Sequence, residues 1–167
     1  MAPCYRRSPY SKTKNRAVIK TNIERFDEIS ADILAHLYNS FPIPVGVSPE
    51  VSGLTVIKYL SFNPVTEEGE TEGEHDPETE FFDASLNWLV HSGFVWSNPR
   101  PFGGTTYPLT AYGLQALKHV PRPELGNETL GEKLSSATKS GAGEIAKETL
   151  NQALSIGMQA LWKGIGG

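Results

Sequence analysis

The chain has 167 residues, a formal net charge of −4 and a hydrophobic fraction of 38%. Globular chains usually reach roughly 45–50%, so we expect part of this chain to lie outside a packed core. The single cysteine, Cys4, excludes an intrachain disulfide and is typical of a reducing compartment. We find neither an apolar run of signal-peptide length nor one long enough to cross a bilayer as a helix. These properties predict a cytoplasmic location, and the net charge leaves nucleic-acid and protein partners both open.

Composition divides the chain into four segments. Residues 1–20 carry basic side chains and no acidic one, which predicts a flexible basic arm, because such a segment cannot form a core. We expect one domain in residues 21–120, a linker rich in Gly, Ser, Thr and Lys in residues 121–143, and an amphipathic helix in residues 144–167. The basic residues of the arm are Arg6, Arg7, Lys12, Lys14, Arg16 and Lys20.

The first part of the domain has the pattern of a helix that ends near Ser40. Its end is predicted by Pro42 and Pro44, since a proline ring blocks the continuation of a helix. The apolar residues at helical spacing are Ile29, Ile33, Leu34 and Leu37.

A second, short helix is expected to run from Pro49 toward Leu60. Ser48 is a suitable N-cap, and proline is favoured at the first helical position. Val51, Val56 and Ile57 would suit a strand equally well. Residues 64–75 are acidic and contain two glycines, which predicts an exposed loop.

The clearest helix spans about residues 76–92. Asp76 is a good N-cap, Pro77 fits the first position, and Gly93 can adopt the left-handed conformation that ends a helix. One apolar stripe along it consists of Phe82, Leu86, Leu89 and Val90.

A β-hairpin is predicted next. Residues 94–96 form the outgoing strand, residues 98–104 a turn-rich tip, and residues 105–109 the returning strand. Thr110 then caps a helix that contains Leu114, Leu117 and Val120.

Two stretches, LNWLVHSGFVWSN (Leu86–Asn98) and YPLTAYGLQAL (Tyr107–Leu117), resemble the winged helix-turn-helix superfamily, particularly small bacterial regulators. In those proteins a helix ends in Leu-x-x-x-Gly before an apolar strand, and the returning strand of the wing leads into Leu-Thr-x-x-Gly-x-x-x-Leu. The resemblance covers about 95 residues. It implies an α+β, mainly α, winged-helix domain with a hairpin wing, and it says little about function, because a fold does not determine a site.

The resemblance also implies that the helix at residues 76–92 would enter the major groove of DNA. This sequence departs from that expectation, because no lysine or arginine lies between Tyr59 and Pro99. Acidic side chains there would repel phosphates, which carry most of the affinity for DNA. Ser85, Asn87 and His91 could touch base edges, but no basic residues would hold them in register. The acids of this span are Glu67, Glu68, Glu70, Glu72, Glu74, Asp76, Glu78, Glu80 and Asp83.

We therefore expect a winged-helix module that binds a protein partner and self-associates. Phe81 and Trp88 form a second apolar face on the helix at 76–92, which indicates either an interaction surface or a further core face. In the last helix, Ala153 and Gly157 let another helix approach closely. This helix could serve one of three roles: self-association, docking on its own domain, or contact with a membrane surface. Its candidate contact residues are Leu154, Met158, Leu161 and Trp162.

The alternative function is a DNA-binding transcriptional regulator that uses the basic arm and Arg100 at the wing tip. Its candidate contacts are Arg6, Arg7, Lys12, Lys14, Arg16 and Arg100.

Enzyme chemistry has little support in the sequence. His36, His75, His91 and His119 are dispersed, with no spacing typical of metal ligands. Neither a phosphate-binding glycine loop nor a nucleophile–histidine pattern occurs. We therefore predict no catalytic residue, no metal site and no cofactor.

Overall fold

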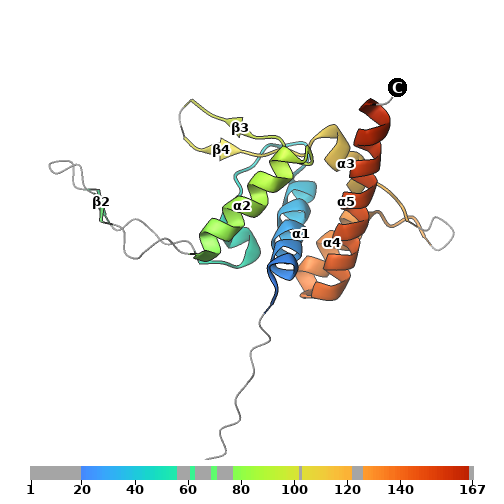
Figure 1. Cartoon of the computed structure of the whole chain (residues 1–167), viewed down its shortest axis with the longest axis horizontal. Coiled ribbons are helices and arrows are strands. Elements are labelled where there is room, and N and C mark those ends of the chain that lie inside the picture. The colour runs from blue at the N-terminus through green and yellow to red at the C-terminus, as the bar shows by residue number, and fades with distance from the viewer. Residues whose placement is uncertain are drawn as a thin grey trace, which may run out of the picture.

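The computed structural model describes residues 20–55, 61–62, 69–70, 77–101, 103–121 and 126–165. These residues form a mainly helical structure with small antiparallel hairpins (Figure 1). In chain order the elements are α1 (Asn22–Ser40), η1 (Pro49–Ser52, a 3-10 helix), β1 (Ser61–Phe62), β2 (Gly69–Glu70), α2 (Pro77–His91), β3 (Asn98–Pro99), β4 (Thr105–Thr106), α3 (Ala111–Leu117), α4 (Leu130–Ser140) and α5 (Gly143–Ile165).

Helix α1 lies at the centre of the molecule. It packs against α2 and η1 on one side and against α4 and α5 on the other (Figure 1). The four apolar residues predicted to form its core face are all buried, which confirms the helical pattern. Ser30, Ala31 and Ala35 are buried as well, so α1 is covered on more of its circumference than one apolar stripe requires.

The two ends of α1 follow from local chemistry. Thr21 and Glu24 form a capping box, in which the Thr21 hydroxyl accepts from the Glu24 amide and the Glu24 carboxylate accepts from the Thr21 amide at 2.8 Å. The helix ends at Ser40, two residues before Pro42, as predicted.

The second helix is much shorter than predicted. It ends at Ser52, because Gly53 adopts a left-handed conformation with φ of 70° and closes a single 3-10 turn. Residues 56–60, where the helix was expected to continue, lie outside the described residues. Within the predicted acidic loop, Gly69–Glu70 forms β2 and pairs with β1 in antiparallel register; most of that loop lies outside the described residues.

Helix α2 agrees with its prediction. It begins at Pro77, buries Phe82, Leu86 and Leu89, and is followed by Gly93 with φ of 79°. The expected cap, Asp76, lies outside the described residues.

The predicted hairpin is present, but its ladder is displaced from residues 94–96 to β3 and β4, with Asn98 opposite Thr106. Val95 forms only an isolated bridge with Leu109. The reason lies in Phe94: its ring is buried, and its carbonyl accepts from the Thr110 amide at 3.1 Å. The backbone at Phe94 is therefore used to hold the start of α3.

Helix α3 is capped by Thr110, as predicted. Gly113 is required at its place, because a Cβ there would collide with the Phe94 carbonyl group. The helix stops at Leu117 and does not reach Val120. The chain turns at this point, and the His119 carbonyl accepts from the Leu130 amide at 2.9 Å, which brings in the next helix.

The predicted linker at residues 121–143 is wrong for its second half, which forms α4. Thr129 and Glu132 make a capping box at its start, and Leu130 and Leu134 are fully buried. Asn39 of α1 donates to Ser135 at 2.5 Å and Tyr38 lies over Gly131, so α4 packs directly on α1.

Helix α5 also docks on its own domain. Leu150 and Ala153 belong to the same buried cluster as the core residues of α1. A Cβ at Gly157 would collide with the ring of Phe94, so this glycine admits a close approach within the chain. Intramolecular docking therefore accounts for the Ala153–Gly157 spacing, for which self-association was the favoured explanation.

If α4 is part of the core, Leu134→Ala lowers the free energy of unfolding by about 2–5 kcal/mol, because a fully buried leucine leaves a cavity. The exposed Ser136 supplies the control, since Ser136→Ala changes it by less than about 0.5 kcal/mol. Urea denaturation followed by circular dichroism measures both. Equal stability of the two variants would contradict the packing of α4.

Two glycines of α5 test its docking. Gly157→Ala lowers the free energy of unfolding by roughly 1–2 kcal/mol, because the new methyl group overpacks the buried Phe94 ring. Gly164→Ala, on the exposed side of the same helix, leaves it unchanged or raises it slightly through helix propensity. A Gly157→Ala protein as stable as Gly164→Ala would show that α5 does not dock there.

Candidate functional site

An apolar groove of about 770 Å³ lies where α2 ends, between the base of the β3–β4 hairpin, the start of α3 and one side of α5. Its walls include Val90, Val95, Leu109, Tyr112 and Leu161. No side chain that lines it carries a charge. The groove can therefore accept an apolar side chain, and its chemistry is that of a binding surface.

The rim of this groove carries large apolar side chains in contact with solvent. Trp96 is 65% exposed and Tyr112 is 40% exposed. The sequence pattern did not single out either residue: Phe94 and Val95 are both buried, so simple alternation does not predict that Trp96 faces outward. Tyr112 lies in the first turn of α3, two residues after the cap Thr110, and belongs to no apolar stripe in the sequence.

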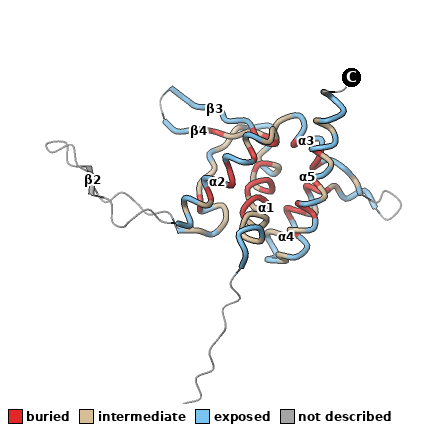
Figure 2. Tube along the Cα trace, in the orientation of Figure 1, coloured by how far each residue is buried: buried red, intermediate tan, exposed pale blue. Residues whose placement is uncertain are grey.

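The last turns of α5 pass the groove and extend beyond the packed core (Figure 1), and they are drawn as exposed in Figure 2. Of the four contact residues predicted on this helix, two face the domain and two face solvent. Leu154 packs against the core, and the methyl groups of Leu161 lie about 4 Å from the position of a Cβ on Gly93. Met158 is 40% exposed and Trp162 is 74% exposed.

The predicted contact residues of α2 pack against α1. The Trp88 ring meets Phe26 edge-on, with 5.0 Å between centroids. The Arg25 guanidinium lies 4.3 Å from the centroid of Phe81 and pairs with Glu78 at 2.8 Å. The second apolar face of α2 is thus largely used inside the molecule, although Trp88 keeps 43% of its surface exposed.

The residues of α2 that were considered for contact with DNA bases are not all accessible. Ser85 is buried and donates to the Phe81 carbonyl, so it is unable to touch a base edge. His91 is exposed, with one ring nitrogen 2.7 Å from the Asn87 carbonyl. Arg100 is exposed at the end of β3. The other predicted nucleic-acid contacts, from Arg6 to Arg16, lie outside the described residues.

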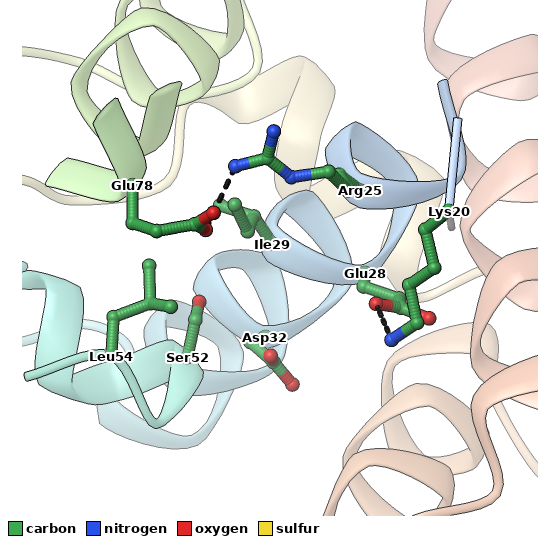
Figure 3. A pocket seen from close by; sticks show the side chains of 8 residues that line it. All are labelled: Lys20, Arg25, Glu28, Ile29, Asp32, Ser52, Leu54 and Glu78. Carbon is green, nitrogen blue, oxygen red and sulfur yellow. Dashed lines mark hydrogen bonds and ion pairs between the residues drawn. The ribbon is translucent and has the colours of Figure 1, made fainter. Parts of the chain in front are cut away.

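A second cavity, of about 510 Å³, opens at the other end of α2, between α1, η1 and the first turn of α2. Figure 3 shows two ion pairs in it: Arg25 with Glu78, and Lys20 with Glu28 at 2.6 Å. Asp32 lies in the same cleft and forms no ion pair with any residue that the structure describes. We refer to this cavity below as the charged cleft.

Burial raises the pKa of Asp32 to about 6, although the neighbouring Ser52 hydroxyl lowers it and the charge of Glu28 raises it further. No feature of the sequence marks Asp32 in advance, since it lies between buried residues of an ordinary helical pattern.

Among the described residues, no group of His, Cys, Asp and Glu side chains has the arrangement of a metal site. Within the same residues, no helix has the length and apolarity needed to cross a membrane.

The packing of Trp88 predicts that Trp88→Ala lowers the free energy of unfolding by roughly 1–2 kcal/mol, because it removes an aromatic pair and buried area. Trp162→Ala changes it by less than about 0.5 kcal/mol when measured at low protein concentration, where association contributes nothing. Thermal unfolding of both variants checks this order. The reverse order would make Trp88 a free surface residue.

Comparisons with protein-family models, with curated proteins and with solved structures find no match to this chain. The groove, the exposed end of α5 and the charged cleft are therefore the features from which a function can be argued.

Proposed function

We propose that this chain is a non-catalytic winged-helix interaction module that binds protein and self-associates through the C-terminal end of α5. The observation that carries the proposal is the apolar groove, whose rim holds Trp96 and Tyr112 and which Leu161 of α5 also lines. The same helix exposes Met158 and Trp162 to solvent. An exposed apolar surface with aromatic residues is typical of a protein interface, where such side chains supply most of the binding energy.

The order of the elements supports the winged-helix part of the proposal. Helix α1 is followed by an extended residue, Val45, which bridges Tyr107 in antiparallel sense. The single turn η1 then takes the place of the second helix, α2 that of the recognition helix, and β3–β4 that of the wing. In this family the bridge at Val45 would correspond to the strand that completes the small sheet.

The charge of α2 supports a protein partner over DNA. Glu80 and Asp83 are solvent-accessible on the helix that would enter the major groove, and Glu78 is bound to Arg25. No lysine or arginine of α2 is present to contact a phosphate. An interface built on tryptophan, tyrosine and methionine requires no such cations.

The arrangement of the groove and the α5 end supports a symmetric dimer. A twofold axis brings the same surface of each copy together, so every contact occurs twice. Because the groove adjoins the end of α5, a twofold contact can place Trp162 of each copy in the groove of the other. In such a dimer, the apolar end of α5 from one copy would meet the apolar groove of the other.

Size-exclusion chromatography with light scattering on the full chain tests this proposal. We expect a dimer at tens of micromolar, and a monomer for the double variant Met158→Ser/Trp162→Ser and for Trp96→Ser, because each removes apolar area from the interface. Ile23→Ser is the matched control, since Ile23 is 70% exposed at the start of α1, away from the groove. A monomeric wild-type chain, or a dimer unaffected by these substitutions, would refute self-association through this surface.

The alternative is DNA binding through the basic arm and Arg100, favoured by the exposure of Arg100 on the hairpin. It predicts that the full chain binds a labelled random duplex in low salt, that the affinity falls steeply as salt is added, and that Arg100→Ala weakens it. Fluorescence anisotropy measures this. The absence of binding in low salt, where phosphate contacts are strongest, is the result that our proposed function expects.

A further inference from the structure

Asp32 lies in the charged cleft, where α1 meets the segment that contains η1 (Figure 3). Its side chain is half-buried, the Ser52 hydroxyl is its polar neighbour, and Ile29 and Leu54 contribute apolar walls to the cleft. Asp32 forms no ion pair with any described residue. Because a carboxylate loses hydration when it is covered, the ionised form of Asp32 is costly in this position and the protonated form is not.

The other charged groups around Asp32 do not remove this cost. Glu28 pairs with lysines on both sides, and Glu78 pairs with Arg25, so each cation is already engaged by another carboxylate. The negative charge of Glu28 further opposes the ionisation of Asp32. From η1, Glu50 is exposed and does not line the cleft, and no residue of α4 lines it either. The charged groups that line the cleft from the start of α1 and from α2, or reach it from α5, are Lys20, Arg25, Glu28, Glu78 and Lys147.

Residues 47–54, which we call the η1 segment, are held to the domain by side-chain packing. Pro49 is buried and Leu54 packs against the hydrophobic core. Among the described residues, the backbone hydrogen bonds of the segment close only its own turn, as when the Leu54 amide donates to the Pro49 carbonyl at 3.1 Å. Gly46 and Gly53 have no atom within 4 Å of a Cβ position, which leaves room for the chain to pivot there. The η1 segment can therefore leave α1 without breaking a backbone hydrogen bond to another described element.

We propose that the η1 segment is a pH-dependent flap over the charged cleft: it stays packed on α1 while Asp32 is protonated, and ionisation of Asp32 favours its opening. Opening brings water to the carboxylate, which removes the cost of covering its charge. Protonation removes the charge instead, so the apolar contacts of Pro49 and Leu54 keep the segment closed.

The direction of the pH dependence follows from the environment of Asp32. Burial raises the pKa of Asp32 from the ordinary 3.8 to about 6, more than the Ser52 hydroxyl lowers it. In the open segment the carboxyl is hydrated and returns toward its ordinary pKa. A group with a raised pKa in the closed state stabilises that state fully only below the lower pKa, and the stabilisation is lost as the pH rises through about 6. The flap is thus closed in weak acid and loosened at neutral pH.

This inference goes beyond the proposed function and is independent of it. The apolar groove and the charged cleft lie at opposite ends of α2, so the flap can open while the groove is unchanged. Failure of the flap experiment would leave self-association through α5 untouched, and a monomeric chain would leave the flap untouched.

Amide hydrogen exchange on the full chain, measured by NMR and corrected for the intrinsic effect of pH, tests the proposal. The Gly53 and Leu54 amides report the segment, since they donate to carbonyl groups of η1. The Leu34 amide, in the buried middle of α1, reports global unfolding. We expect protection at Gly53 and Leu54 to be lower than at Leu34, and to fall by about 10- to 50-fold between about pH 4 and about pH 7.5. The lower figure allows for the partial exposure of Asp32.

Asp32→Asn keeps the shape of the side chain and cannot ionise. We expect it to abolish the pH dependence at Gly53 and Leu54 and to keep the segment protected at neutral pH. Asp83→Asn is the matched control, because it removes the same charge from an exposed position on α2 and leaves the wild-type pH dependence in place.

Three results would overturn the flap. Protection at Gly53 and Leu54 that equals protection at Leu34 would mean that the segment opens only when the whole domain unfolds. Local protection that does not change with pH, or that changes equally in Asp32→Asn, would mean that opening does not hydrate Asp32. An Asp32 carboxyl that titrates near its ordinary pKa of 3.8 in the folded chain, followed by NMR, would remove the driving force.

Discussion

The structure depends on the burial of α1 on most of its circumference. Ile33 and Leu34 have no exposed surface, and even the small residues Ser30 and Ala31 are covered. An amphipathic helix at a surface needs a partner on one side, but a helix buried this far needs partners on two. Helix α2 covers one side, and α4 with α5 cover the other (Figure 1).

This requirement explains why the C-terminal third of the described chain belongs to the domain. Without α4 and α5, the side of α1 that they cover would be open to water, at a cost of roughly 25 cal/mol for each Å² of apolar surface. Leu130, Leu134 and Leu150 supply that cover and have no exposed surface themselves. Gly157 and Leu161 of α5 still face the domain, whereas Met158 and Trp162 are exposed to solvent.

Helix α2 separates two surfaces of opposite character. Its first turn borders the charged cleft through Glu78, and its last residues border the apolar groove through Val90. Acidic residues in the first turn of α2 are favoured there, because the N-terminal end of a helix dipole is positive. One helix therefore positions both an electrostatic surface and an apolar surface without placing charges beside the groove.

Local chemistry was enough to predict many elements. Pro42 marks the end of α1, Gly93 the end of α2, and Thr110 the start of α3, since each acts through its own backbone or a cap within three residues. Thr129 and Glu132 carry the same kind of signal at the start of α4. The glycine- and serine-rich composition around them favoured a linker, although Leu130, Leu134 and Ala137 lie at helical spacing and are buried.

The sequence by itself determined the end of α1, the bounds of α2 and the start of α3, and it determined which face of α1 and α2 is apolar. Tertiary structure decided what those faces meet: Trp88 packs on Phe26, Gly157 admits Phe94, and Asp32 becomes a desolvated carboxylate. These outcomes join residues far apart in the chain, so no periodicity encodes them. Caps and turns act over a few residues, whereas burial and charge pairing depend on which helices come together.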